Sequence, residues 1–219
     1  MEDVLAVYQR PYDPLRPVVC LDEKSKELHA TPHGALPMEA KAQAKAQGKR
    51  GRPRREDSEY QRNGTRNLFL WVEPLAGRRS VSVTERRTGL DFAAQLQRLV
   101  GAYPEAERVV LVTDNLNTHG PACLYEAFAP DEARRIAAKI EWHYTPEHGS
   151  WLNMAEIELS VLSRQCLNRR LADATALERE AAAWEQARNG AKATIRWQFT
   201  AEDARIKLRR LYPQTKNNS

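Results

Sequence analysis

Residues 109–115 are Val109-Val110-Leu111-Val112-Thr113-Asp114-Asn115. The uninterrupted apolar run is typical of a strand buried on both faces, as in the middle of an α/β sheet. An ionised carboxylate at the end of such a strand is costly unless another group compensates it. Because α/β folds also bind their ligands at strand ends, Asp114 is the first candidate functional residue.

A second stretch repeats this pattern. Residues 17–22 are Pro17-Val18-Val19-Cys20-Leu21-Asp22, which predicts an apolar strand that ends at an aspartate. Neighbouring side chains of a strand face opposite sides of the sheet, so Asp22 and Glu23 cannot both point at one site. We therefore expect only one of these two carboxylates to be functional.

Composition sets broad limits. The chain has 219 residues, 42% of them hydrophobic, which is enough for a real core in one large or two small domains. Its net charge of +5 is a weak indication of a polyanionic partner. Three cysteines without short spacing indicate a reducing compartment and argue against a thiolate metal site. No apolar run approaches the ~20 residues of a membrane helix, and no signal-peptide pattern opens the chain. We expect a cytoplasmic protein without a membrane partner.

The remaining elements complete an α/β pattern. Residues 67–72 and 80–84 predict an antiparallel hairpin, and Thr88 with Asp91 predicts a helix start. Further helices are expected from Pro121 and Pro130, from Ser150 to about residue 168, over 173–188 and from Thr200, with a short strand over 140–144. We expect an extended lead-in over 1–16, one catalytic domain over 17–170, and a helical extension of that domain over 171–219.

Residues 31–66 differ in composition from the rest, being rich in proline, glycine and basic residues. A loop of this length inside a domain is either functional or disordered. One reading is a basic arm that contacts a phosphate backbone, and the other is a solvated insertion. The candidate contacts are Lys49, Arg50, Arg52, Arg54 and Arg55.

The order of the elements suggests a chemistry. Carboxylates lie on the first strand, at the end of the fourth strand, and near the start of the helix that follows the fifth. Three carboxylates gathered at one sheet edge form a hard, oxygen-rich site suited to Mg²⁺ or Mn²⁺. Two such ions about 3.5–4 Å apart can support phosphodiester cleavage. This layout favours a nuclease-type enzyme.

Several motifs make the inference more specific. They are Leu21-Asp22-Glu23-Lys24-Ser25, Arg62-Asn63-Gly64-Thr65, Thr113-Asp114-Asn115-Leu116-Asn117-Thr118-His119, Tyr144-Thr145-Pro146, His148-Gly149-Ser150-Trp151-Leu152-Asn153-Met154-Ala155-Glu156 and Trp197-Gln198-Phe199-Thr200. Together, roughly from Val4 to Pro213, they resemble the DDE endonuclease domain of mariner-like bacterial insertion-sequence transposases. The resemblance implies the ribonuclease-H-like fold of retroviral integrases, with a mixed five-stranded sheet flanked by helices.

The same resemblance implies the catalytic residues Asp22, Asp114 and Glu156, which would also hold two Mg²⁺ or Mn²⁺ ions, with Asp22 bridging them. The family pattern places its glutamate three residues after the asparagine that here is Asn153, and residues three apart share a helix face. Glu158 lies about 200° further round the helix than Glu156, where we expect it to meet solvent or a neighbouring helix.

The family also implies DNA as the partner, both element ends and target, and a homodimer on DNA in a bacterial, nucleoid-associated setting. Members carry helix-turn-helix domains ahead of the catalytic domain, so we expect this chain to be a catalytic half, with an upstream-frame segment as a further partner. The alternatives are a structure-selective nuclease that cuts without joining and an inactive DNA-binding remnant.

Other polar and aromatic residues leave two readings open. His119 either touches a phosphate or a metal-bound water, or bonds the loop backbone. Asn153 is a further candidate DNA contact. Trp142 and Trp151 either stack on a base or pack against the protein. A last group, on the C-terminal helix, either binds DNA or is a solvated face: Arg205, Lys207, Arg209 and Arg210.

Overall fold

A computed structural model describes residues 1–31, 35–36, 55–56, 59–116 and 119–211. Its centre is a five-stranded sheet with the strand order β5-β4-β1-β6-β7. The strands are β1 (Val18–Ala30), β4 (Gln61–Glu73), β5 (Arg78–Thr84), β6 (Val109–Thr113) and β7 (Ile140–Tyr144). β4 is antiparallel to both β1 and β5, whereas β6 is parallel to both β1 and β7. This mixed sheet confirms the expected ribonuclease-H-like fold class.

The prediction for residues 109–113 is confirmed. Every residue of β6 is buried, and the strand lies between β1 and β7. Val19 pairs with Leu111 on one side, and Leu111 pairs with Trp142 on the other. The apolar run is therefore placed where a strand loses contact with water on both faces, and Asp114 follows it directly.

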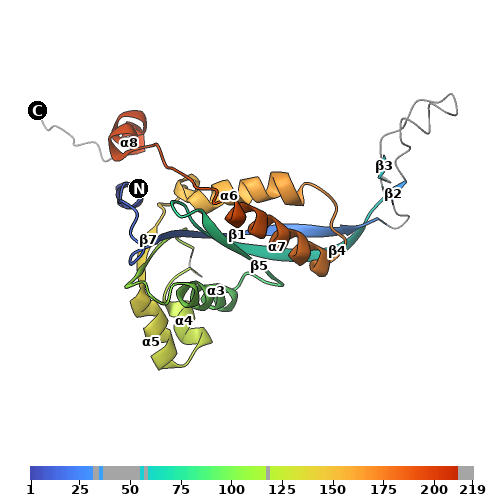
Figure 1. Cartoon of the computed structure of the whole chain (residues 1–219), viewed down its shortest axis with the longest axis horizontal. Coiled ribbons are helices and arrows are strands. Elements are labelled where there is room, and N and C mark those ends of the chain that lie inside the picture. Colours follow the sequence, from blue (N-terminus) through green and yellow to red (C-terminus); the bar gives the residue numbers. More distant parts are fainter. Residues whose placement is uncertain (32–34, 37–54, 57–58, 117–118, 212–219) are drawn as a thin grey trace, which may run out of the picture.

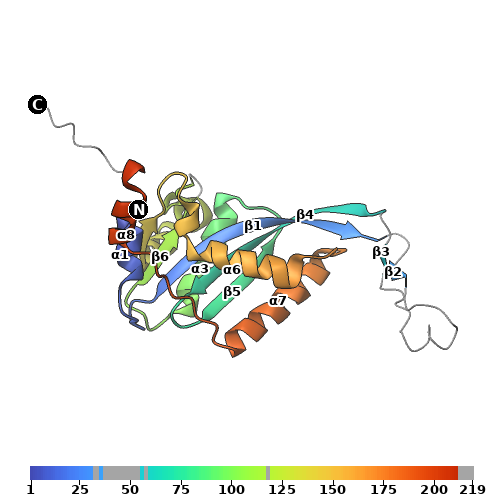
Figure 2. The ribbon, with the colours of Figure 1, turned by 90° about the horizontal axis from the view of Figure 1, so that it is seen from above.

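Helices cover both faces of the sheet (Figures 1 and 2). One face carries α6 (Met154–Leu162) and α7 (Ala174–Gly190), and the other carries α3 (Gly89–Ala102), α4 (Ala122–Ala127) and α5 (Pro130–Lys139). The side chains of β1 alternate between the two resulting cores: Cys20 belongs to the core beneath α6, and Leu21 to the core beneath α3. By the same alternation Asp22 lies on the α6 side.

Three helix starts agree with the sequence. Thr88 caps α3 and Thr200 caps α8 (Ala201–Lys207), each in a capping box with the aspartate three residues later. Asp173 caps α7 through a hydrogen bond to the backbone of Ala176. These starts are set by side-chain hydrogen bonds within one helical turn, which is why they are visible in the sequence.

Three expectations were wrong. Residues 2–8 form the helix α1 (Glu2–Tyr8) instead of an extended lead-in, because Val4, Leu5 and Val7 are buried on the α6 side of the core. The first strand does not end at Asp22: β1 continues to Ala30, paired along most of its length with β4, so this carboxylate lies inside a strand.

The helix expected from Ser150 is also divided. A 3-10 turn, η1 (Ser150–Leu152), comes first, and α6 then begins after its cap residue, Asn153. A π-helical turn, η2 (Ser163–Leu167), follows α6. This division separates Trp151 from the helix that carries Glu156.

The outer parts of β1 and β4 lead away from the helical layers to a small sheet of β2 (Ala35–Leu36) and β3 (Arg55–Glu56) (Figure 1). The predicted DNA contacts Lys49, Arg50, Arg52 and Arg54 lie outside the described residues, and Arg55 is placed only as part of β3. The C-terminal α8 is followed by the 3-10 turn η3 (Arg209–Leu211). None of the helices within the described ranges is long and apolar enough to cross a membrane.

Candidate active site

The three predicted carboxylates come from three elements that meet at one place in the sheet. Asp22 is on β1, Asp114 directly follows β6, and Glu156 is in the first turn of α6. Burial raises the pKa of Asp22 to about 7, and the negative charges of Glu156, Glu23 and Asp114 contribute to this rise. All of these carboxylates are therefore close enough to influence the ionisation of Asp22.

Asn153 joins the start of α6 to β1. Its Oδ1 accepts a hydrogen bond from the backbone N–H of Ala155 at 3.1 Å and so caps the helix. Its Nδ2 donates to the carbonyl of Leu21 at 2.9 Å and to Oδ2 of Asp22 at 3.2 Å. Asn153 is fully buried, so one side chain fixes both the helix that carries Glu156 and the carboxylate of Asp22.

His119 holds the carboxylate of Asp114, as Asn153 holds that of Asp22. Its Nδ1 forms a short contact with Oδ1 of Asp114, its Nε2 lies 3.4 Å from Oε2 of Glu23, and its ring stacks on Phe92 with centroids 4.3 Å apart. Burial lowers the pKa of His119, but the hydrogen bond to Asp114 and the charge of Glu23 outweigh this and leave it above the usual value. The ring is thus enclosed by two carboxylates and a phenyl ring, and not directed at the loop backbone.

Glu23 is a residue whose part in the site the sequence did not reveal. It lies on the opposite face of β1 from Asp22, as alternation requires, yet it contacts His119 and lies 3.8 Å from a guanidinium nitrogen of Arg87. Glu23 therefore acts on Asp114 through His119, while Asp22 faces Asn153. No sequence spacing links positions this far apart, so only the tertiary structure could reveal the contact.

Glu158 occupies a different environment from Glu156. Its carboxylate is buried and forms ion pairs with Nε of Arg79 at 3.0 Å and with Nη2 of Arg188 at 2.5 Å. The sequence left open whether Glu158 meets solvent or a neighbouring helix. In the structure it meets a neighbouring helix, because Arg188 belongs to α7. Glu156 is exposed and lines a hollow beside η1.

The site carries an excess of negative charge. Four carboxylates, those of Asp22, Glu23, Asp114 and Glu156, are opposed by one histidine and by the peripheral Arg87. Hard carboxylate oxygens are the ligands that divalent cations such as Mg²⁺ prefer, and Oε2 of Glu23, although it lies 3.4 Å from Nε2 of His119, accepts no hydrogen bond of good geometry. The residues present therefore suit a divalent cation, although across the described chain no three metal-binding side chains already lie at ligand spacing.

Three of the further residues considered from the sequence make contacts within the protein. Arg205 pairs with Glu2 and Lys207 with Asp203. Trp142 stacks on Tyr144 at 5.9 Å and is half-buried. By contrast, Trp151 is 46% exposed.

Comparisons with known proteins give a family match and two similar solved structures. Residues 17–178, about three quarters of the chain, match the family model described as DDE superfamily endonuclease. Among solved structures, the Mos1 strand transfer complex matches with a TM-score of 0.49 and 16% identity, over 87% of this chain and 55% of that one. The intasome of simian T-cell lymphotropic virus in complex with the PP2A regulatory subunit B56 gamma matches with a TM-score of 0.39 and 17% identity, over 54% of this chain and 42% of that one.

The chain thus spans about half the length of these two proteins. No curated protein matches it. Enzymes of the matched superfamily generally use divalent metal ions, in agreement with the carboxylate oxygens gathered around Asp22. The family model covers β1, β6 and the start of α6, and with them Asp22, Asp114 and Glu156. This chain belongs to the DDE superfamily of endonucleases.

Proposed function

We propose that the chain is the catalytic part of a DNA transposase, which cleaves a DNA strand and transfers the freed 3′-hydroxyl into a second DNA. The observation that carries this proposal is the convergence of Asp22, Asp114 and Glu156 from three separate elements, in a site with uncompensated negative charge. Family membership gives the reaction class, phosphodiester cleavage.

The reaction has two balanced displacements at phosphorus. In the first, a water oxygen bonds to phosphorus, the bond from phosphorus to the 3′-oxygen breaks, and the proton lost by water is balanced by protonation of the departing 3′-oxygen. In the second, that 3′-hydroxyl attacks a phosphodiester of the target, whose own 3′-oxygen leaves with a proton. When bound, two divalent cations stabilise the charge on the attacking and leaving oxygens of such displacements.

The protein's own residues have separable roles in this proposal. Asp22, Asp114 and Glu156 would hold the cations, which we propose to be two Mg²⁺ or Mn²⁺ ions. Asn153 keeps Asp22 in place through its Nδ2, and His119 does so for Asp114. Both are buried, so we assign them positioning roles in place of the direct DNA contact considered from the sequence.

Partners follow from the same proposal. The substrates are the ends of a mobile element and a target DNA, and two copies of the chain act together on them. A helix-turn-helix segment from an upstream reading frame would supply sequence recognition. We place this activity in the cytoplasm, on the bacterial nucleoid.

Plasmid nicking in Mn²⁺ tests the proposal. We expect the wild type to nick and both Asp114→Asn and Glu156→Gln to be inactive, while Asp131→Asn, which removes an exposed carboxylate on α5, keeps wild-type activity. Adding an oligonucleotide duplex with a recessed 3′-hydroxyl then separates transposase from nuclease: covalent joining to the plasmid supports strand transfer. Nicking without joining indicates a structure-selective nuclease, and equal activity of wild type and Asp114→Asn refutes the site.

A further inference from the structure

Trp151 is an unusual side chain for its position. It lies in η1, two residues before the cap of α6 and five before Glu156. The residue is 46% exposed, although a tryptophan is normally buried for most of its area. The exposed part of Trp151 is therefore available to bind another molecule close to Glu156.

The ring is held rigidly from one side. Trp197 stacks on it with centroids 6.4 Å apart and an interplanar angle of 25°, and Phe199 meets it edge-on at 5.9 Å. Trp197 is itself fixed, because its Nε1 donates to the carbonyl of Phe199 at 2.7 Å and its ring packs on Tyr8. Trp151 is therefore a preformed flat surface, and binding to it would cost little side-chain entropy.

The exposed part of Trp151 borders a hollow of about 510 Å³ that Glu156 also lines. The other lining residues are Ser150, Ile157, Ser160 and Arg164. An aromatic surface, a catalytic carboxylate and an arginine thus surround one space on the outer side of α6.

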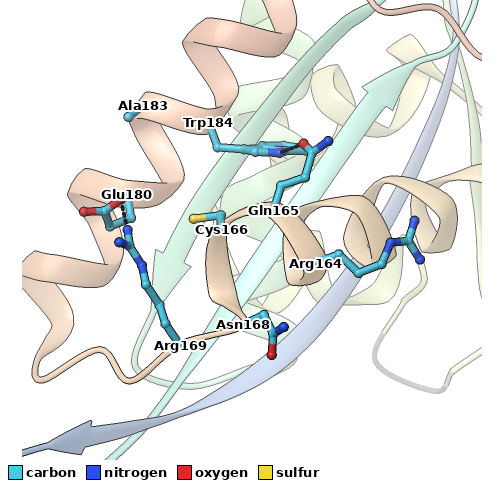
Figure 3. Close-up of a pocket in the computed structure, with 8 residues that line it drawn as sticks. All are labelled: Arg164, Gln165, Cys166, Asn168, Arg169, Glu180, Ala183 and Trp184. Carbon is cyan, nitrogen blue, oxygen red and sulfur yellow. Dashed lines mark hydrogen bonds and ion pairs between the residues drawn. The ribbon is translucent and has the colours of Figure 1, made fainter. Parts of the chain in front are cut away.

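Arg164 offers a cation to this hollow. Its Nη1 donates to Oγ of Ser160 at 2.7 Å, and two carboxylates on the neighbouring helices pair with other arginines, Glu180 with Arg169 and Glu158 with Arg188. Figure 3 shows that its guanidinium points away from Trp184 and Glu180 and back along the helix. The side chain is therefore oriented toward the hollow that contains Glu156.

A second hollow on the far side of Arg164 has a volume of about 370 Å³ and lies between η2 and α7 (Figure 3). Several of its polar groups have partners: Gln165 accepts a hydrogen bond from Trp184, and Arg169 pairs with Glu180. It has no exposed aromatic platform, so it does not share the features of the hollow beside Trp151.

We propose that the hollow between Trp151 and Arg164 binds a nucleotide of the DNA strand next to the cleaved phosphodiester, with its base stacked on Trp151 and its phosphate on Arg164. Every base has a flat π-face, so stacking on an aromatic residue is tolerant of sequence. A guanidinium binds phosphate oxygens through charge-assisted hydrogen bonds. The phosphate lies at the Arg164 end, because the carboxylate of Glu156 repels an anion at the other.

The location of this subsite rests on the proposed function, but its test needs no catalysis. The full chain is titrated, at one salt concentration and in EDTA, with two fluorescein-labelled probes: a 20-nucleotide oligothymidylate and an abasic strand of the same length. Both probes carry the same phosphates, and only the first carries bases. Fluorescence anisotropy gives the dissociation constants.

Trp151→Leu, which keeps an apolar contact with Trp197, is expected to weaken oligothymidylate binding about fivefold or more and to leave abasic binding unchanged. Arg164→Gln should weaken binding of both probes by a similar factor. Trp151→Tyr retains a stacking ring and should keep most of the oligothymidylate affinity. Tyr125→Leu, which removes an exposed ring on α4, should change neither.

The proposal is overturned if Trp151→Leu weakens both probes equally, if it weakens neither, or if the wild type does not prefer oligothymidylate to the abasic strand. Trp151→Tyr is the control for misfolding. If this variant loses the base preference while its melting temperature is unchanged, the proposal is also overturned. Plasmid nicking is scored separately. A base preference without nicking refutes the proposed function but keeps the subsite, whereas nicking and joining without a base preference keep the proposed function and refute the subsite.

Discussion

Replacing Glu158 with glutamine is expected to destabilise the fold strongly, although the change removes only a charge. Glu158 lies between Arg79 on β5 and Arg188 on α7, with contacts of 3.0 Å and 2.5 Å. The Arg79 side chain is completely buried, whereas that of Arg188 is 25% exposed. Without the carboxylate, Arg188 can turn to water, but Arg79 remains a buried cation without an anionic partner.

The size of the loss follows from this asymmetry. Removing one partner of a buried ion pair costs about 3–5 kcal/mol. Arg79 keeps hydrogen bonds to the backbone carbonyls of Gly77 and Ala193, so we expect the lower limit, about 3 kcal/mol. For a chain of this size each kcal/mol lowers the melting temperature by about 2–4 °C, so the expected drop is about 6–12 °C.

Urea denaturation at neutral pH and calorimetry measure these quantities. Glu132→Gln is the matched control, because Glu132 pairs with Arg135 at the surface of α5, where water screens the pair, and it should have a far smaller effect. The double variant Arg79→Met with Glu158→Leu removes both buried charges and should recover most of the loss. A loss below about 1 kcal/mol in Glu158→Gln, or a double variant no more stable than the single one, would refute this reasoning.

Three further predictions concern the active site and its supports. Asn153→Ser keeps a capping oxygen but loses the hydrogen bonds to Asp22 and to the carbonyl of Leu21, so calorimetry should show a lowered melting temperature with a cooperative transition, while Mn²⁺-dependent plasmid nicking falls at least tenfold at a temperature where the variant is folded. Mn²⁺ at about 100 times its dissociation constant should stabilise the wild type by about 2.7 kcal/mol. This thermal shift should be absent in Asp22→Asn and after chelation with EDTA; an equal shift in that variant would place the cation elsewhere. Thr88→Ala removes the capping box of α3 and should cost about 1 kcal/mol in urea denaturation, and an unchanged midpoint would contradict the role of the cap.

Elements whose signal is local could be predicted from the sequence. The buried strand β6 follows from its run of apolar residues, and the starts of α3 and α8 follow from Thr88 with Asp91 and from Thr200 with Asp203. The helix over residues 2–8 is not predicted from the sequence, because its apolar side chains are buried against residues that are distant in the chain. Tyr8 packs on Trp197, from the other end of the chain.

The extent of β1 was misjudged for a related reason. Residues 24–27 are polar and gave no strand signal in the sequence, yet they pair with residues of β4. The backbone hydrogen bonds that pair these residues with β4 do not require apolar side chains, so a polar segment of a strand shows no alternation in the sequence. Asp22 therefore lies inside a strand, held by Asn153, and not at a free strand end.

From the sequence by itself, apolar periodicity and helix caps indicated an α/β fold, because these signals act over a few residues, and the motifs, through their resemblance to a known family, indicated that family and the candidate carboxylates Asp22, Asp114 and Glu156. Only the tertiary structure decided which side chains support them: His119 and Glu23 beside Asp114, Asn153 beside Asp22, and the arginines around Glu158. The physical reason is that a buried charge or hydrogen-bonding group needs a partner in space, and folding brings that partner from any distance along the chain.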